Sequence, residues 1–113
     1  MIIIYHNPMW SKSRKSVEIL NNQKIKFKII EYVKQGITEN ELVDISKKLN
    51  LRFKDFIRKK DQNARDLNLE NDTEVLNAII NYPKIMERPI VIYKEKAIIA
   101  RPAELLYDFL SNL

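Results

Sequence analysis

A short polar segment near the start of the chain carries the residue types most able to do chemistry. It runs from His6 to Arg14 and reads HNPMWSKSR. Asn and Pro favour a turn, and a turn that opens a helix leaves backbone N–H groups free at the positive end of the helix dipole. Such a helix start attracts anions and lowers the pKa of a thiol placed there. The segment therefore indicates an anion site, and an ordinary helix start with a basic first turn is the alternative.

Hydroxyl and imidazole groups in this segment add to that chemistry. Donors to a bound anion would come from Ser11, Ser13, Lys12 and Arg14. Ser11 is also expected to cap the helix that follows. His6 is the only histidine of the chain, and its pKa range lets it stabilise a neighbouring anion or thiolate. A buried histidine that only satisfies its own hydrogen bonds is the alternative interpretation.

Three arginines stand where strands and helices are expected to begin or end. Arg58 ends a helical segment, Arg88 precedes the third strand and Arg101 ends the fourth. The planar guanidinium suits a tetrahedral oxyanion, and adjacent strands would bring Arg88 and Arg101 close together. Spacing alone does not predict that all three converge. Pro89 is a candidate for a cis peptide bond after Arg88, and an ordinary proline at a strand start is the alternative.

The elements that position these residues follow from the hydrophobic pattern. Strands are expected over residues 2–5, 27–32, 89–93 and 97–100, and helices over 12–23, 38–49, 53–58, 72–82 and 101–113. Thr38 and Glu41 form a capping box, and Asp72 is expected to cap the helix that it begins. Pro102 suits the first position of the last helix. The apolar face of that helix is expected to comprise Leu105, Leu106, Phe109, Leu110 and Leu113.

The order of these elements predicts the fold class. It is β-α-β, then a helical insertion, then β-β-α. The first two strands need a crossover and are expected to pair in parallel, whereas the last two form a hairpin. This arrangement is a thioredoxin-like, three-layer α/β fold around a central mixed sheet. No linker rich in Gly, Ser or Pro divides the chain, so residues 1–113 are predicted to form a single domain.

Composition excludes several classes of function. The chain of 113 residues has no cysteine, which excludes disulfides, a cysteine-ligated metal and thiol chemistry of its own. One histidine cannot form a metal cluster, so no metal site is expected. The net charge of +5 is spread along the chain, which disfavours nucleic acid as a partner. No signal peptide and no apolar run of about 18 residues is present, so we expect a cytoplasmic protein without a membrane span.

The motifs taken together resemble the ArsC arsenate-reductase family. The resemblance is carried in order by Tyr5-His6-Asn7-Pro8, Ser11-Lys12-Ser13-Arg14, Phe56-Ile57-Arg58-Lys59, Tyr82-Pro83, Glu87-Arg88-Pro89-Ile90-Val91 and Arg101-Pro102-Ala103-Glu104. It covers nearly the whole chain, and several motifs in the right order are far more specific than any one of them.

The resemblance implies a defined mechanism for the family. A cysteine at the start of the first helix attacks arsenate, glutathione as co-substrate opens the adduct to give arsenite, and glutaredoxin reduces the resulting mixed disulfide. Three arginines hold the oxyanion, and the matching positions are Arg58, Arg88 and Arg101. A histidine that favours the thiolate is matched by His6.

One residue departs from the family at the centre of this mechanism. The position of the nucleophilic cysteine is Trp10, and an indole cannot form the covalent adduct. We therefore expect no thiol-dependent reduction and predict a pseudoenzyme that binds an oxyanion, glutathione or a protein partner. The alternative is a regulator similar to the Spx-type proteins that bind RNA polymerase. A third hypothesis is that the working protein carries cysteine at position 10, because cysteine and tryptophan codons can differ by one base. The protein would then be an ordinary arsenate reductase.

Overall fold

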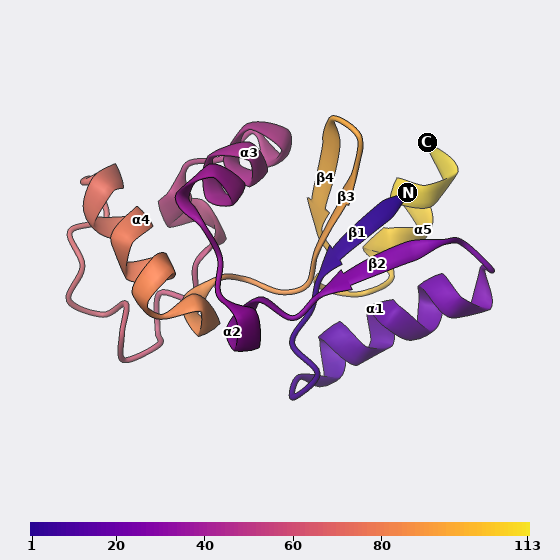
Figure 1. Ribbon diagram of the computed structural model, residues 1–113, viewed down its shortest axis with the longest axis horizontal. Helices are drawn as coiled ribbons and strands as arrows, with labels where there is room; N and C mark the ends of the chain where they lie inside the picture. The colour runs from indigo at the N-terminus through magenta and orange to yellow at the C-terminus, as the bar shows by residue number, and fades with distance from the viewer. The chain divides into compact units, whose positions relative to one another are not determined.

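Four β-strands form one mixed sheet in the computed structural model, which describes residues 1–113. The strands are β1 (Ile2–Tyr5), β2 (Phe27–Ile30), β3 (Ile90–Tyr93) and β4 (Lys96–Ile99), in the spatial order β2-β1-β3-β4 (Figure 1). β1 pairs in parallel with β2 and antiparallel with β3, and β3 forms an antiparallel hairpin with β4. The predicted mixed α/β sheet and both predicted pairings are confirmed.

The chain divides into two compact units. The first comprises Met1–Glu31 and Arg88–Leu113, and it contains the sheet with α1 (Ser11–Asn22) and α5 (Leu105–Ser111). The second, Tyr32–Glu87, contains α2 (Tyr32–Gln35), α3 (Glu39–Leu49), α4 (Asp72–Asn81) and the 3₁₀ helices Phe53–Phe56 and Pro83–Ile85. The expectation of a single domain stays a prediction. No helix combines the length and the apolar character needed to cross a membrane.

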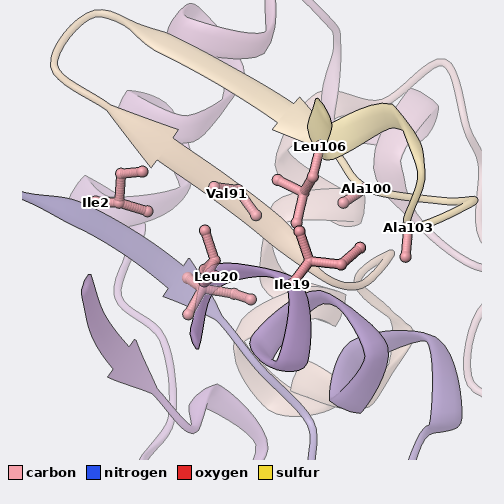
Figure 2. Packing of buried hydrophobic residues seen from close by; sticks show 8 residues of the cluster. Ile2, Ile19, Leu20, Val91, Ala100, Ala103 and Leu106 are labelled. Carbon is pink, nitrogen blue, oxygen red and sulfur yellow. The ribbon is translucent and has the colours of Figure 1, made fainter. Parts of the chain in front are cut away.

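The core of the first unit explains how its two helices are held. Ile2 and Ile4 of β1 point to the same face of the sheet because strand side chains alternate, and both are buried. Side chains from α1, β3 and α5 pack against that face (Figure 2). The buried cluster comprises Ile2, Ile4, Ile19, Leu20, Val91, Ala100, Ala103 and Leu106. Burial of this apolar surface therefore fixes α1 against the sheet and holds its first turn beside the end of β1.

Helix starts differ from the predictions by one residue in two places. Ser11 was predicted to cap α1, but the capping position is Trp10, whose side chain makes no capping hydrogen bond. Asp72 was predicted to cap α4, but Asn71 does so by accepting from the Glu74 N–H at 3.1 Å. Asn and Asp cap equally well, so local sequence alone could not separate these two positions. The capping box of Thr38 and Glu41 is confirmed.

Two predicted elements, the second strand and the helix over 53–58, are shorter than expected. The second strand ends at Ile30, and Tyr32 already belongs to α2. The predicted helix over 53–58 is a 3₁₀ helix over Phe53–Phe56. Ile57 then pairs with Met86 in an isolated β-bridge, so Arg58 follows a bridge and does not end a helix.

The last helix also starts later than predicted. α5 begins at Leu105, and Pro102 lies before it rather than at its first position. The N–H groups of Leu105 and Leu106 bond three residues back, to Pro102 and Ala103, so residues before the helix form tight turns. Leu105 and Leu113 were predicted to face the core, but they are exposed, and only Leu106 on this helix is fully buried.

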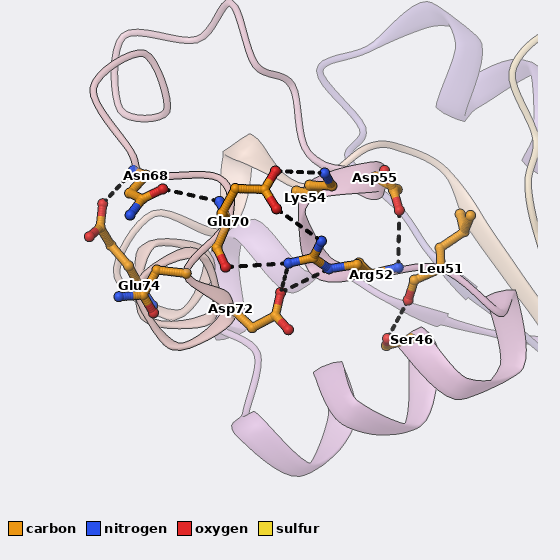
Figure 3. Close-up of polar contacts among 10 residues, drawn as sticks. Ser46, Leu51, Arg52, Lys54, Asp55, Asn68, Glu70, Asp72 and Glu74 are labelled. Atoms are coloured by element: carbon orange, nitrogen blue, oxygen red, sulfur yellow. Dashed lines mark hydrogen bonds and ion pairs between the residues drawn. The ribbon is translucent and has the colours of Figure 1, made fainter.

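Side-chain bonds organise the polar segment that precedes α4 in the second unit (Figure 3). The Arg52 guanidinium bonds Glu70 at 3.3 Å and Asp72 at 3.1 Å, and Lys54 bonds Glu70 at 3.0 Å. Bonding to Lys54 and then Arg52 lowers the pKa of the Glu70 carboxyl. All these side chains meet solvent, so each pair is weak and screened by salt. The network therefore orders a segment that lacks regular secondary structure.

Candidate functional site

The register of the sheet brings distant parts of the chain to one edge. Tyr5 at the end of β1 lies opposite Ile90 at the start of β3, and Ile90 lies opposite Ile99 at the end of β4. One step further, the Ala100 N–H donates to the Pro89 carbonyl at 2.9 Å. The turn after β1, the residues before β3 and the residues after β4 therefore leave the sheet at the same edge.

The turn between β1 and α1 uses its own backbone donors. The Asn7 N–H donates to the Ser13 hydroxyl at 3.0 Å, and the Asn7 side-chain oxygen accepts from the Met9 N–H at 3.1 Å. The Trp10 N–H donates to the Asn7 carbonyl at 3.1 Å, and the Arg14 guanidinium donates to the Pro8 carbonyl at 2.8 Å. These contacts fix the turn, and the N–H groups of Asn7, Met9 and Trp10 all donate within it.

The first turn of α1 has donors that no helical carbonyl can accept. The first intrahelical bond joins the Arg14 N–H to the Trp10 carbonyl, so the N–H groups of residues 11–13 precede it. An indole has no acceptor atom, so Trp10 cannot cap these groups as Ser or Asp would. The start of α1 therefore keeps the partial positive charge of a helix N-terminus, and no acidic residue lies in its first turn.

His6 and Ser13 form a buried pair beneath the turn. His6 Nδ1 lies 2.5 Å from the Ser13 hydroxyl oxygen. Burial lowers the pKa of His6, and Arg14 lowers it further, although Glu31 opposes them. The imidazole is therefore neutral near pH 7, with one ring nitrogen protonated and the other an acceptor. Ser13 was predicted to bind an oxyanion, but its side chain is fully buried and committed to this turn.

The lowered pKa of His6 predicts how stability depends on pH. Protonation of the buried imidazole is disfavoured in the folded chain, whereas the unfolded chain protonates near pH 6.5. The unfolded state therefore binds more protons as pH falls from about 6.5 through the folded pKa, and stability drops over that range. Replacing His6→Gln should flatten this part of the curve. Urea unfolding of both proteins between pH 7.5 and 5 checks this, and parallel curves would contradict it.

Trp10 and Arg88 contact each other at this edge. The Arg88 guanidinium carbon lies over the Trp10 ring at 3.5 Å from its centroid, well within the range of a cation–π interaction. Arg88 is 5% exposed, whereas Trp10 is 40% exposed. The indole thus covers one face of the Arg88 guanidinium, a group whose planar donors suit anions. The peptide bond between Arg88 and Pro89 is cis, as is that between Arg101 and Pro102.

The other two arginines lie in different settings. Arg101 follows β4 at the same edge and is exposed. Arg58 belongs to the second unit, where its N–H donates to the Ile85 carbonyl at 2.6 Å. The first unit therefore brings Arg88 and Arg101 to the edge that carries Trp10, and a role for Arg58 with them stays a prediction.

A shallow hollow lies beside the start of α1. It has a volume of about 310 Å³ and is lined by Ser11, Lys12, Lys15, Pro102, Ala103 and Glu104. Ser11 thus faces this hollow, together with Lys12, which was predicted as a donor, and Lys15, which sequence reasoning did not assign to the site. Their spacing of three residues at a helix start was the available signal, because it places both on one face. No group of three or more His, Asp or Glu side chains is arranged to hold a metal.

A strand-turn-helix start facing a cis-proline loop, on a mixed four-stranded sheet, defines a thioredoxin-like α/β protein. The chain matches the ArsC family over residues 5–109. It is 40% identical to an arsenate reductase of Haemophilus influenzae, covering 96% of this chain and 98% of that protein. An arsenate reductase of Neisseria meningitidis is 38% identical, with 91% and 92% covered. The solved structure of an arsenate reductase from Vibrio cholerae superimposes with a TM-score of 0.88 at 33% identity, covering 95% of each chain. The chain belongs to the ArsC family.

Proposed function

We propose that this ArsC-family chain binds tetrahedral oxyanions reversibly and does not reduce arsenate by the thiol mechanism. The observation that carries the proposal is the contact between Trp10 and Arg88 at one edge of the sheet. An indole stands at the start of α1, in contact with a retained arginine, in a chain that has no cysteine. The family relatives are named arsenate reductases. The proposal is that this chain keeps the binding of the oxyanion and lacks the covalent reaction with it.

The loss of reduction follows from the chemistry of position 10. An indole offers no thiolate to attack arsenic, and no other residue of the chain is a cysteine. No cysteine-linked adduct forms for glutathione to open. No mixed disulfide forms that glutaredoxin could reduce. Glutathione and glutaredoxin are therefore expected to act as co-substrate and partner only for a variant that regains the thiol.

Retained positive charge supports oxyanion binding. The first unit presents several positively charged hydrogen-bond donors. They are the uncapped first turn of α1, the exposed Arg101 and the lysines beside the hollow. Glu104 is the one acidic residue among the residues that line the hollow. Helix N-termini and guanidinium groups both favour phosphate-like anions. Such binding would be non-covalent and weakened by salt.

Calorimetric titration with phosphate, arsenate and glutathione tests the proposal. We expect both inorganic anions to bind, and we expect Arg101→Ala to weaken that binding by about 10- to 100-fold, because a charged hydrogen bond is lost. Arg65→Ala is the matched control, since Arg65 is an exposed arginine of the second unit. Equal affinities in all three proteins, or no heat with either anion, would contradict oxyanion binding.

The alternative of an Spx-like regulator has no specific contact in its favour. It rests on resemblance around Arg88-Pro89, which the reductases share. Retention of the chain by RNA polymerase α-subunit in a pull-down would revive it.

A further inference from the structure

We propose that the Trp10 indole is an internal ligand of Arg88 that competes with anions for this arginine. The contact is autoinhibitory, because it occupies the guanidinium of the site whose function is proposed above. The inference rests on that proposed function and adds to it a reason why the residue at position 10 determines the affinity for anions.

Burial shows that something must move before an anion can reach Arg88. The side chain is 5% exposed, and its guanidinium lies 3.5 Å from the centroid of the indole ring. An anion forms hydrogen bonds to the guanidinium N–H groups at about 2.8 Å, which requires access to those groups. The indole lies on one face of the guanidinium, so an anion that approaches Arg88 from that side can engage it only if the indole is displaced.

The indole is the partner that can leave. Trp10 is 40% exposed, and its neighbour Met9 is 82% exposed. It occupies the capping position of α1, where its side chain makes no capping bond, so rotation of the side chain would not break the helix start. Arg88, in contrast, is 5% exposed, and the backbone next to it is held because the Pro89 carbonyl accepts from the Ala100 N–H. Competition should thus appear as movement of the more exposed indole away from the guanidinium.

The energy of the contact sets the size of the effect. A cation over an indole is stabilised more strongly when it is removed from water, and the free energy of such a contact corresponds to about a 5- to 30-fold change in affinity. Phenylalanine has a weaker quadrupole than tryptophan. Anion affinity should therefore rise in the order of wild type, Trp10→Phe and Trp10→Ala.

The test measures phosphate affinity in these three proteins by calorimetry, with Met9→Ala as the matched control. Met9 is the exposed neighbour in the same turn and has no ring to stack. We expect Trp10→Ala to bind phosphate about 5- to 30-fold more tightly than wild type, Trp10→Phe to lie between them, and Met9→Ala to match wild type. Circular dichroism confirms that each variant is folded.

Intrinsic fluorescence gives a second readout, because Trp10 is the only tryptophan. Phosphate should change the emission of the wild-type protein as the indole leaves the guanidinium. Equal affinity in wild type and Trp10→Ala, with unchanged emission, would overturn the competition and leave oxyanion binding standing. Binding by Trp10→Ala alone would support the competition and overturn the proposed function of the natural chain. Absence of binding in every variant would overturn both.

Discussion

Replacing Trp10→Cys is expected to create arsenate reductase activity at least about 10³-fold above that of the wild-type protein, since removing the nucleophile of a covalent mechanism costs several orders of magnitude. The new thiol would stand at the start of α1, where uncapped N–H groups and the helix dipole lower a thiol pKa. The same change removes the indole that covers Arg88. Consumption of NADPH in an assay coupled through glutathione, glutaredoxin and glutathione reductase measures the effect.

Matched variants separate the thiol from the other consequences of losing the indole. Trp10→Ser opens the same space but offers a hydroxyl that cannot form a disulfide, so it should stay inactive. Adding Arg101→Ala to Trp10→Cys should lower kcat/KM again if this arginine binds the oxyanion. Turnover by the wild-type protein would refute the pseudoenzyme proposal. A folded but inactive cysteine variant would show that the site differs from its relatives in more than position 10.

Much of the candidate site was predictable from the sequence, because the order of the strands determines which residues lie at one edge of the sheet. Parallel pairing of β1 with β2 and a final hairpin were both predictable from patterning, and the hairpin brings Arg88 and Arg101 to one edge. The antiparallel pairing of β1 with β3 adds the turn after β1 to that edge. The contact between Trp10 and Arg88 was not predictable. It depends on the side-chain position of one residue that departs from its family, and no periodicity describes that.

The role of Ser13 shows a second limit. Its place at the start of the first helix predicted a donor that faces an anion. In the fold, its hydroxyl turns inward, where it joins His6 to the Asn7 N–H. A serine in the first turn of a helix can bond either outward or back to the preceding turn. The position of the turn relative to β1 decides between these two hydrogen bonds, and that position depends on the tertiary structure.

Replacing Leu106→Ala is expected to lower the free energy of unfolding by about 2–5 kcal/mol, because it leaves a cavity in a packed core. Leu106 is fully buried and belongs to the cluster that joins α1, β1, β3 and α5. Hydrophobic periodicity alone placed Leu105 and Leu106 on the same apolar face. The late start of α5 at Leu105 leaves that residue 39% exposed instead.

Leu105→Ala is therefore the matched control, with an expected change within about 0.5 kcal/mol. Urea unfolding followed by circular dichroism measures both variants, and the slope of each transition shows whether the denatured state has changed. Similar losses at the two positions would mean that α5 packs through the wider face that its sequence pattern suggested. A large loss at Leu106 alone would support the packing that holds α1 against the sheet and its first turn, with Trp10, beside the end of β1.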